Sequence, residues 1–231
     1  MKNPGQSTSW QGGNKDMKQL LLIDEEFGAG AITIGEQIAA RLNWEFFDQA
    51  LTHEIARLAK IPVEVCQQHI ERNDPFLQRL VNVIWRGSVD RNLPSPDLAV
   101  LDSRRLAALV QQVIEQTAEK KPCVMIGRGA PYFLRNRADT FCVFLYASRE
   151  LKFRRVLKRV GNEAEAIQLV DTIDDDRRKF VMHHLGQDWP NRHLFHAMFN
   201  TGIGDEETVD AIMQLLDAMN RGENSPNDFA P

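Results

Sequence analysis

The sequence has few cysteines and no long apolar run. Its three cysteines among 231 residues, Cys66, Cys123 and Cys142, are odd in number and widely spaced, so no disulfide framework is implied. Cys123 and Cys142 lie in apolar runs, so we expect both thiols to be buried. No apolar run approaches the roughly 20 residues that cross a bilayer. Residues 1–16 also lack the apolar core of a secretory signal. We therefore expect a cytoplasmic protein without membrane contact.

Positive charge is not in excess either. The formal net charge is −4 and the isoelectric point is about 5.9. These values argue against a nucleic-acid-binding protein whose whole surface is basic, because binding phosphate polymers requires excess lysine and arginine. The six histidines do not combine with cysteines or carboxylates at a standard metal-ligand spacing, so we assign no metal-ligating residues.

Short apolar runs alternate with segments of helical period, and this alternation predicts a mostly parallel sheet covered on both faces. Strands are expected at residues 20–23, 44–47, 123–126, 141–146 and 195–199. Helices are expected at residues 33–42 and 101–119, after the N-caps Ser148 and Asn162, and from Asp205 onward. The charged run at residues 171–178 fits either a hinged flap or a charged helix.

The chain divides into one α/β domain, residues 17–220, between two polar ends that are predicted to be disordered, residues 1–16 and 221–231. Residues 52–100 break the alternation and are predicted to form a helical insertion. Ligands of such folds bind at the carboxyl ends of the strands, so this insertion is expected to form one wall of the site.

A glycine-containing loop follows the first strand and opens the first helix. Gly28 and Gly30 allow backbone N–H groups to turn toward an anion, and the helix N-terminus favours negative charge. The alternative is a tight turn without a ligand. The loop departs from the phosphate-binding pattern G-x-x-x-x-G-K-[ST], because Ala31 stands where the lysine belongs and Glu25 stands where the first glycine belongs. Glu25 and Glu26 also bring negative charge close to any bound phosphate.

Two basic features follow later strands. Arg128 stands between two glycines just after the run 123–126, where its guanidinium can grip a phosphate; the alternative is a surface arginine in a turn. The helix that ends near Arg159 carries six basic residues, which form either a solvated face or charge stabilisation for phosphoryl transfer.

The ordered segments IDEEFGAGAITIGEQIAARL, WEFFDQALTHEIA, CVMIGRGAPYFL, FCVFLYASRELKFRRVLKR and FNTG resemble the cytidylate kinase-like family of P-loop nucleoside monophosphate kinases, over about residues 19–219. The resemblance implies a P-loop NTPase-type three-layer α/β/α fold with a five-stranded parallel sheet in the order 2-3-1-4-5. It also implies that the insertion at about 52–100 binds a nucleoside monophosphate and that residues of about 160–192 form a lid.

The same resemblance implies transfer of a phosphoryl group from ATP and Mg²⁺ to a pyrimidine nucleotide such as CMP or dCMP. It assigns catalytic roles to Asp48, Arg128 and Arg155. It assigns binding of the ATP cofactor to the loop and to two lid arginines: Gly28, Ala29, Gly30, Ala31, Ile32, Thr33, Arg177 and Arg178.

The sequence departs from the family pattern at two positions that matter for catalysis. Ala31 replaces the loop lysine, and Gly129 replaces the aspartate that follows the motif arginine. Losing a transition-state charge contact costs on the order of 10²–10³ in rate. One hypothesis is therefore a kinase with weak activity. A second is an inactive pseudokinase that senses a nucleotide or binds a protein partner, and a third is a loop without a nucleotide ligand.

Overall fold

The computed structural model describes residues 18–47, 103–119, 122–127, 130–134, 136–182 and 186–221. The predicted insertion at 52–100 and the two predicted disordered ends, except Arg221, lie outside these residues. Cys66, Asp48 and Arg128 lie outside them as well. Within the described ranges, no helix combines the length and the apolar character that crossing a membrane requires.

Five parallel strands form one sheet in the order β2-β3-β1-β4-β5, as predicted. The strands are β1 (Leu20–Glu25), β2 (Glu45–Phe47), β3 (Cys123–Ile126), β4 (Thr140–Tyr146) and β5 (Ala197–Asn200). The central strand β1 pairs along its full length with β4, and its residues 20–23 pair with β3 on the other side. Because all strands are parallel, the chain leaves each of them at the same edge of the sheet.

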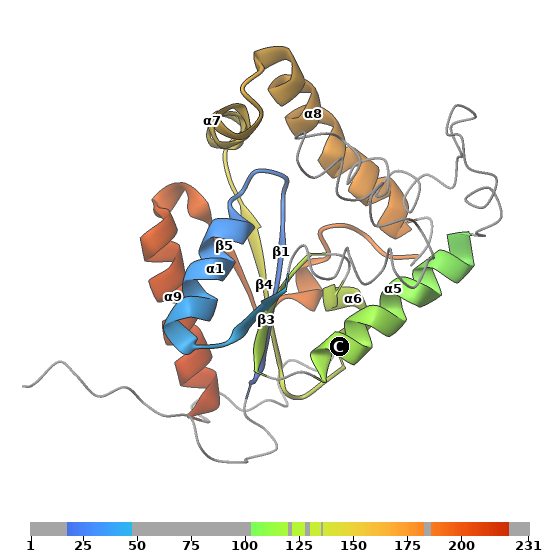
Figure 1. The fold of residues 1–231 in the computed structure, drawn as a ribbon, viewed down its shortest axis with the longest axis vertical. Helices are drawn as coiled ribbons and strands as arrows, with labels where there is room; N and C mark the ends of the chain where they lie inside the picture. The colour runs from blue at the N-terminus through green and yellow to red at the C-terminus, as the bar shows by residue number, and fades with distance from the viewer. Residues whose placement is uncertain are drawn as a thin grey trace, which may run out of the picture.

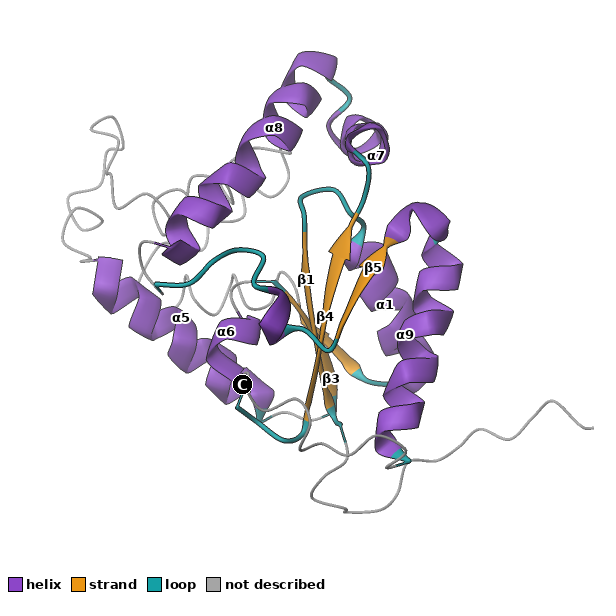
Figure 2. Ribbon diagram, turned by 180° about the vertical axis from the view of Figure 1, so that it is seen from behind, coloured by secondary structure: helices purple, strands orange, loops and turns teal. Residues whose placement is uncertain are grey.

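Helices cover both faces of the sheet, which gives the predicted three-layer α/β/α architecture. Figures 1 and 2 show α1 (Ala31–Leu42) and α9 (Asp205–Asn220) on one face, and α5 (Ser103–Ala118) and α6 (Ala130–Leu134) on the other. The helices α7 (Arg149–Val160) and α8 (Glu163–Phe180) lie beyond the carboxyl ends of β1 and β4. Two 3₁₀ turns, η3 (Arg192–Leu194) and η4 (Thr201–Ile203), flank β5.

Alternate residues of β1 supply the two halves of the core. Leu21 and Ile23 pack with Ile34 and Ile38 of α1, whereas Leu20 and Leu22 belong to the cluster on the opposite face. A parallel strand covered on both faces is continuously apolar for this reason. Both expected buried cysteines are confirmed, and burial raises the pKa of the Cys142 thiol to about 12.

Most predicted elements are confirmed, and the predicted N-caps at Ser148 and Asn162 each accept the expected backbone N–H. The last strand begins at Ala197 rather than at residue 195, because the N–H of Phe195 closes the preceding turn η3. The short helix α6 was not predicted, since five residues are too few to show a helical period. The charged run 171–178 lies within α8 and is therefore helical.

The N-terminal end of α1 is brought close to the sheet at Gly35. A Cβ atom at Gly35 would lie 2.7 Å from Cδ1 of Ile126 and 3.0 Å from Cε2 of Phe46. We predict that Gly35→Val lowers the free energy of unfolding by about 1–3 kcal/mol, the usual cost of overpacking a core. Urea denaturation measures this change, and Glu36→Val on the exposed side of the same helix is the control. Equal stability of the two variants would contradict the close packing.

Candidate functional site

The loop between β1 and α1 turns at two glycines that have backbone conformations unfavourable to other residues. Gly28 has φ of 86° and Gly30 has φ of 101°. A Cβ at Gly28 would lie 2.9 Å from Cγ2 of Val156, and one at Gly30 would lie 3.2 Å from Cζ of Arg155. Both neighbours belong to α7. The glycines therefore allow α7 to pack directly on the loop, in addition to turning its amides.

Glu25 places its carboxylate at the N-terminus of α1. The backbone N–H of Ala31 donates to Glu25 Oε2 at 2.8 Å, while the N-cap residue Gly30 offers no side chain. Helix N-termini at such loops favour anions, and here the anionic group is the protein's own carboxylate. Burial raises the pKa of Glu25, although the Ala31 N–H and Arg177 both favour its ionised form.

Asp24 is a second carboxyl group beneath the loop, and only 6% of it is exposed. Its two oxygens accept hydrogen bonds of 3.0 Å each from Nε1 of Trp189 and from the N–H of Glu25. Burial raises the pKa of Asp24, and the positive charge of Arg177 opposes this effect, as do the two hydrogen bonds.

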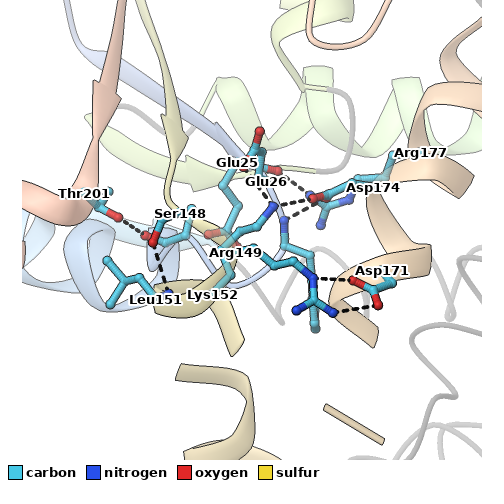
Figure 3. Close-up of polar contacts among 12 residues, drawn as sticks. Glu25, Glu26, Ser148, Arg149, Leu151, Lys152, Asp171, Asp174, Arg177 and Thr201 are labelled. Atoms are coloured by element: carbon cyan, nitrogen blue, oxygen red, sulfur yellow. Dashed lines mark hydrogen bonds and ion pairs between the residues drawn. The ribbon is translucent and has the colours of Figure 1, made fainter. Parts of the chain in front are cut away.

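Helices α7 and α8 hold the loop from outside through an ion-pair network (Figure 3). Lys152 of α7, only 9% exposed, donates to Glu26 at 2.9 Å and to Asp174 of α8 at 3.2 Å. The other oxygen of Asp174 accepts the N–H of Phe27 at 2.8 Å. Burial lowers the pKa of Lys152, but the two carboxylates outweigh this effect, so the net pKa is raised.

The two expected lid arginines point in different directions. Arg177 donates to the carbonyl oxygen of Glu25, and its guanidinium lies 5.8 Å from the centre of the Trp189 ring. Arg178 is exposed and pairs with Asp175 of the same helix at 2.5 Å. Of the two, therefore, Arg177 lies at the loop.

Arg155 clamps the loop to the start of α9. Its guanidinium donates to the carbonyl oxygen of Ala29 and to Oγ1 of Thr201, both at 2.7 Å, and also pairs with Asp205. The Thr201 hydroxyl in turn donates to the Ala29 carbonyl at 2.8 Å. This arginine is thus bound to three elements of the protein itself.

The structure brings most of the predicted binding residues together. Gly28, Ala29, Gly30 and Ala31 lie in the loop and at its helix start, and Ile32 and Thr33 are exposed on the first turn of α1. Sequence reasoning did not find Lys152, Asp174, Trp189, Thr201 and Asp205 as parts of the site. Lys152 and Asp174 stand in charged runs of the sequence. No sequence pattern predicts, however, that Lys152 contacts Glu26, 126 positions away, or that Asp174 contacts Phe27, 147 positions away. No cluster of three metal-ligating side chains occurs among the described residues.

The strand, loop and helix N-terminus, together with the 2-3-1-4-5 sheet, define a P-loop kinase-like protein. The family model described as "Cytidylate kinase-like family" matches residues 21–203, and the chain belongs to that family. No match was found among the curated proteins compared.

Two solved structures illustrate the fold. An uncharacterized protein from Eubacterium ventriosum ATCC 27560 is 16% identical, with a TM-score of 0.57, and the alignment covers 86% of this chain and 98% of that one. A gluconokinase from Sinorhizobium meliloti 1021 is also 16% identical, with a TM-score of 0.51 and coverage of 89% and 95%. At this identity the likeness establishes the fold alone.

The raised pKa values of Asp24 and Glu25 make stability depend on pH. Each carboxyl group binds its proton more tightly in the folded than in the unfolded protein. Its contribution to stability is therefore complete below its ordinary pKa and is lost as the pH rises through the raised pKa. We predict that Asp24→Asn removes part of this loss, so its unfolding temperature relative to wild type should increase as the pH rises above the ordinary pKa of an aspartate. A difference that does not change with pH would contradict the raised pKa of Asp24.

Proposed function

We propose that the protein binds a nucleotide through its phosphates at the loop. We further propose that it transfers a phosphoryl group from ATP with Mg²⁺ to a pyrimidine nucleoside monophosphate such as CMP or dCMP, at a rate reduced by the missing loop lysine. Family membership supports the reaction class. The base preference follows from the family's description and from the sequence resemblance.

The observation that carries the proposal is the hydrogen bond from the Ala31 N–H to a carboxylate oxygen. An amide at the N-terminus of a helix, after a parallel strand and a loop with two positive-φ glycines, already holds an anionic group here. A phosphate oxygen has the same hydrogen-bonding requirement as a carboxylate oxygen. The loop therefore fits the phosphate chain of a nucleotide.

The residues of the site also indicate which groups would hold the phosphates of ATP and which charge Mg²⁺ would need to neutralise. The loop amides would hold the phosphates, and the described part of the chain places the cations of Arg155, Arg177 and Lys152 beside the loop. Mg²⁺ supplies neutralisation of phosphate charge when it is bound with the nucleotide. Such neutralisation is needed at this loop, because Glu25, Glu26, Asp24 and Asp174 lie beside it.

A second candidate function is a pseudokinase that senses a nucleotide or binds a protein partner without transferring phosphate. One observation favours it: the anion at the Ala31 N–H is the protein's own Glu25. A catalytic loop would leave this position to the substrate. The missing lysine and the occupied amide are two separate departures from a working kinase site.

We predict that incubation with ATP and Mg²⁺ converts CMP or dCMP into the diphosphate, detected by chromatography, with UMP and AMP as competing acceptors. Arg128→Ala should weaken monophosphate binding by about 1.5–3 kcal/mol, the range for hydrogen bonds to charged groups. A product that disappears in this variant supports the kinase. Absence of product from every acceptor, in a protein with a cooperative unfolding transition, would contradict phosphoryl transfer.

The second candidate predicts a different result for the loop lysine. Ala31→Lys should not restore robust turnover, because the backbone N–H of this residue would still be held by Glu25. Steady-state kinetics with the acceptor that binds best measures the effect, with Ala40→Lys on the exposed side of the same helix as the control. Robust turnover from Ala31→Lys alone would show that the lysine was the single missing element.

A further inference from the structure

Five N–H groups between Glu25 and Ala31 are hydrogen-bonded by the protein itself. The N–H groups of Glu26 and Ala29 donate to backbone carbonyls, of Leu145 and Glu26 respectively, both at 2.9 Å. Three further N–H groups donate to carboxylates: Glu25 to Asp24, Phe27 to Asp174 and Ala31 to Glu25. Buried backbone donors require such partners. A phosphate that binds any of these five N–H groups must therefore replace the acceptor that now holds it.

Of the three carboxylates, that of Glu25 lies where a ligand would bind. Asp24 is buried below the loop and bonded to Trp189, and Asp174 of α8 accepts a hydrogen bond from Lys152 of α7. Glu25 instead holds the first N–H of α1, at the end of the helix that favours an anion.

We propose that Glu25 is an intramolecular competitor of the nucleotide phosphate: its carboxylate occupies the phosphate position in the free protein and must leave before a nucleotide binds. This inference rests on the proposed function and adds to it a residue that determines phosphate affinity. The two groups cannot share the site, because like charges at hydrogen-bonding distance repel strongly.

The other possible role of Glu25 is structural, as a cap that fixes the loop and α1. The loop conformation has other supports, however. Arg155 and Thr201 hold the carbonyl of Ala29, and Asp174 holds the N–H of Phe27. Removing the Glu25 side chain should thus leave the loop in place and the first N–H of α1 free to donate to a ligand.

Competition lowers the apparent affinity by the fraction of molecules in which the amide is free. A hydrogen bond of the strength usual for charged groups keeps that fraction at about a tenth or less. Removing Glu25 should therefore tighten phosphate binding by at least about tenfold. A cap would give the opposite pattern, with lower stability and unchanged or weaker binding.

The test is isothermal titration calorimetry of the full chain with two probes, Mg·ATP and Mg·tripolyphosphate. Four proteins are compared: wild type, Glu25→Ala, Glu25→Gln and Glu36→Ala. Glu25→Gln keeps an acceptor but loses the charge, and it carries the test if thermal unfolding shows that Glu25→Ala is not folded. Glu36→Ala removes one negative charge from an exposed position of the same helix and controls for overall charge.

We expect both probes to bind Glu25→Ala at least about tenfold more tightly than wild type, Glu25→Gln to lie between them, and Glu36→Ala to match wild type. Wild type that binds Mg·ATP with no gain in either Glu25 variant would overturn the inference and leave the proposed function standing. A gain for tripolyphosphate without any nucleotide binding would support the inference and refute the proposed function. An equal gain in Glu36→Ala, or no binding by any protein, would overturn the inference.

Discussion

The close packing of α7 on the loop is the constraint from which the geometry of the site follows. β1 and β4 are adjacent and in register up to Glu25 and Leu145, so the segments that leave them meet at one edge of the sheet. Atoms of Val156 and Arg155 then occupy the space that side chains at positions 28 and 30 would need. The positive φ angles of the two glycines turn the chain into α1. The first N–H of α1, that of Ala31, then lies at the N-terminus of the helix, where it donates to Glu25. The hydrogen bonds from Arg155 to Ala29 and from Lys152 to Glu26 are consequences of the same packing, because both residues lie on the turns of α7 that contact the loop.

The loop is geometrically an anion site and electrostatically an acidic one. Four carboxyl groups of the described residues lie at its first half, and the cations that pair with them there are Lys152 and Arg177. Burial raises the pKa of two of these carboxyl groups, which means that the folded protein holds them at a cost in stability near neutral pH. Groups held at such a cost are often found where a protein binds or transforms a ligand. A phosphate entering this environment needs a cation with it, and the same electrostatics make a metal-bound nucleotide a better ligand than a free one.

The sequence predicted the elements that depend on local pattern, and it missed the contacts that depend on topology. Apolar runs and caps located the strands and most helices, because burial on both faces and N-terminal hydrogen bonds leave direct signatures at Leu20–Glu25 and at Ser148. A local pattern also identified Glu25 as a departure from the phosphate-binding motif, since it replaces a glycine of that motif. Its bond to the Ala31 N–H could not be predicted, because a carboxylate six residues away can equally point to solvent. The Lys152–Asp174–Phe27 network joins three segments that only the fold brings together, and so does the hydrogen bond from Trp189 to Asp24.

Binding and transfer place different demands on this site. Binding requires one exchange, in which a phosphate oxygen replaces Glu25 at the N-terminus of α1. Transfer requires in addition that a cation change partners, because the charge that a loop lysine would place on the phosphates must come from elsewhere. Lys152 is a lysine that hydrogen-bonds to the loop, but its ammonium group is shared between Glu26 and Asp174. Moving it to a phosphate would leave these two carboxylates without their cation, which is costly for a pair shielded from water. Arg177 has an easier exchange, since its hydrogen bond goes to a neutral carbonyl and its ion pair with Asp174 is longer, at 3.9 Å. A substitution at Glu25 can therefore change affinity without changing turnover, whereas restoring turnover depends on the cations that α7 and α8 supply.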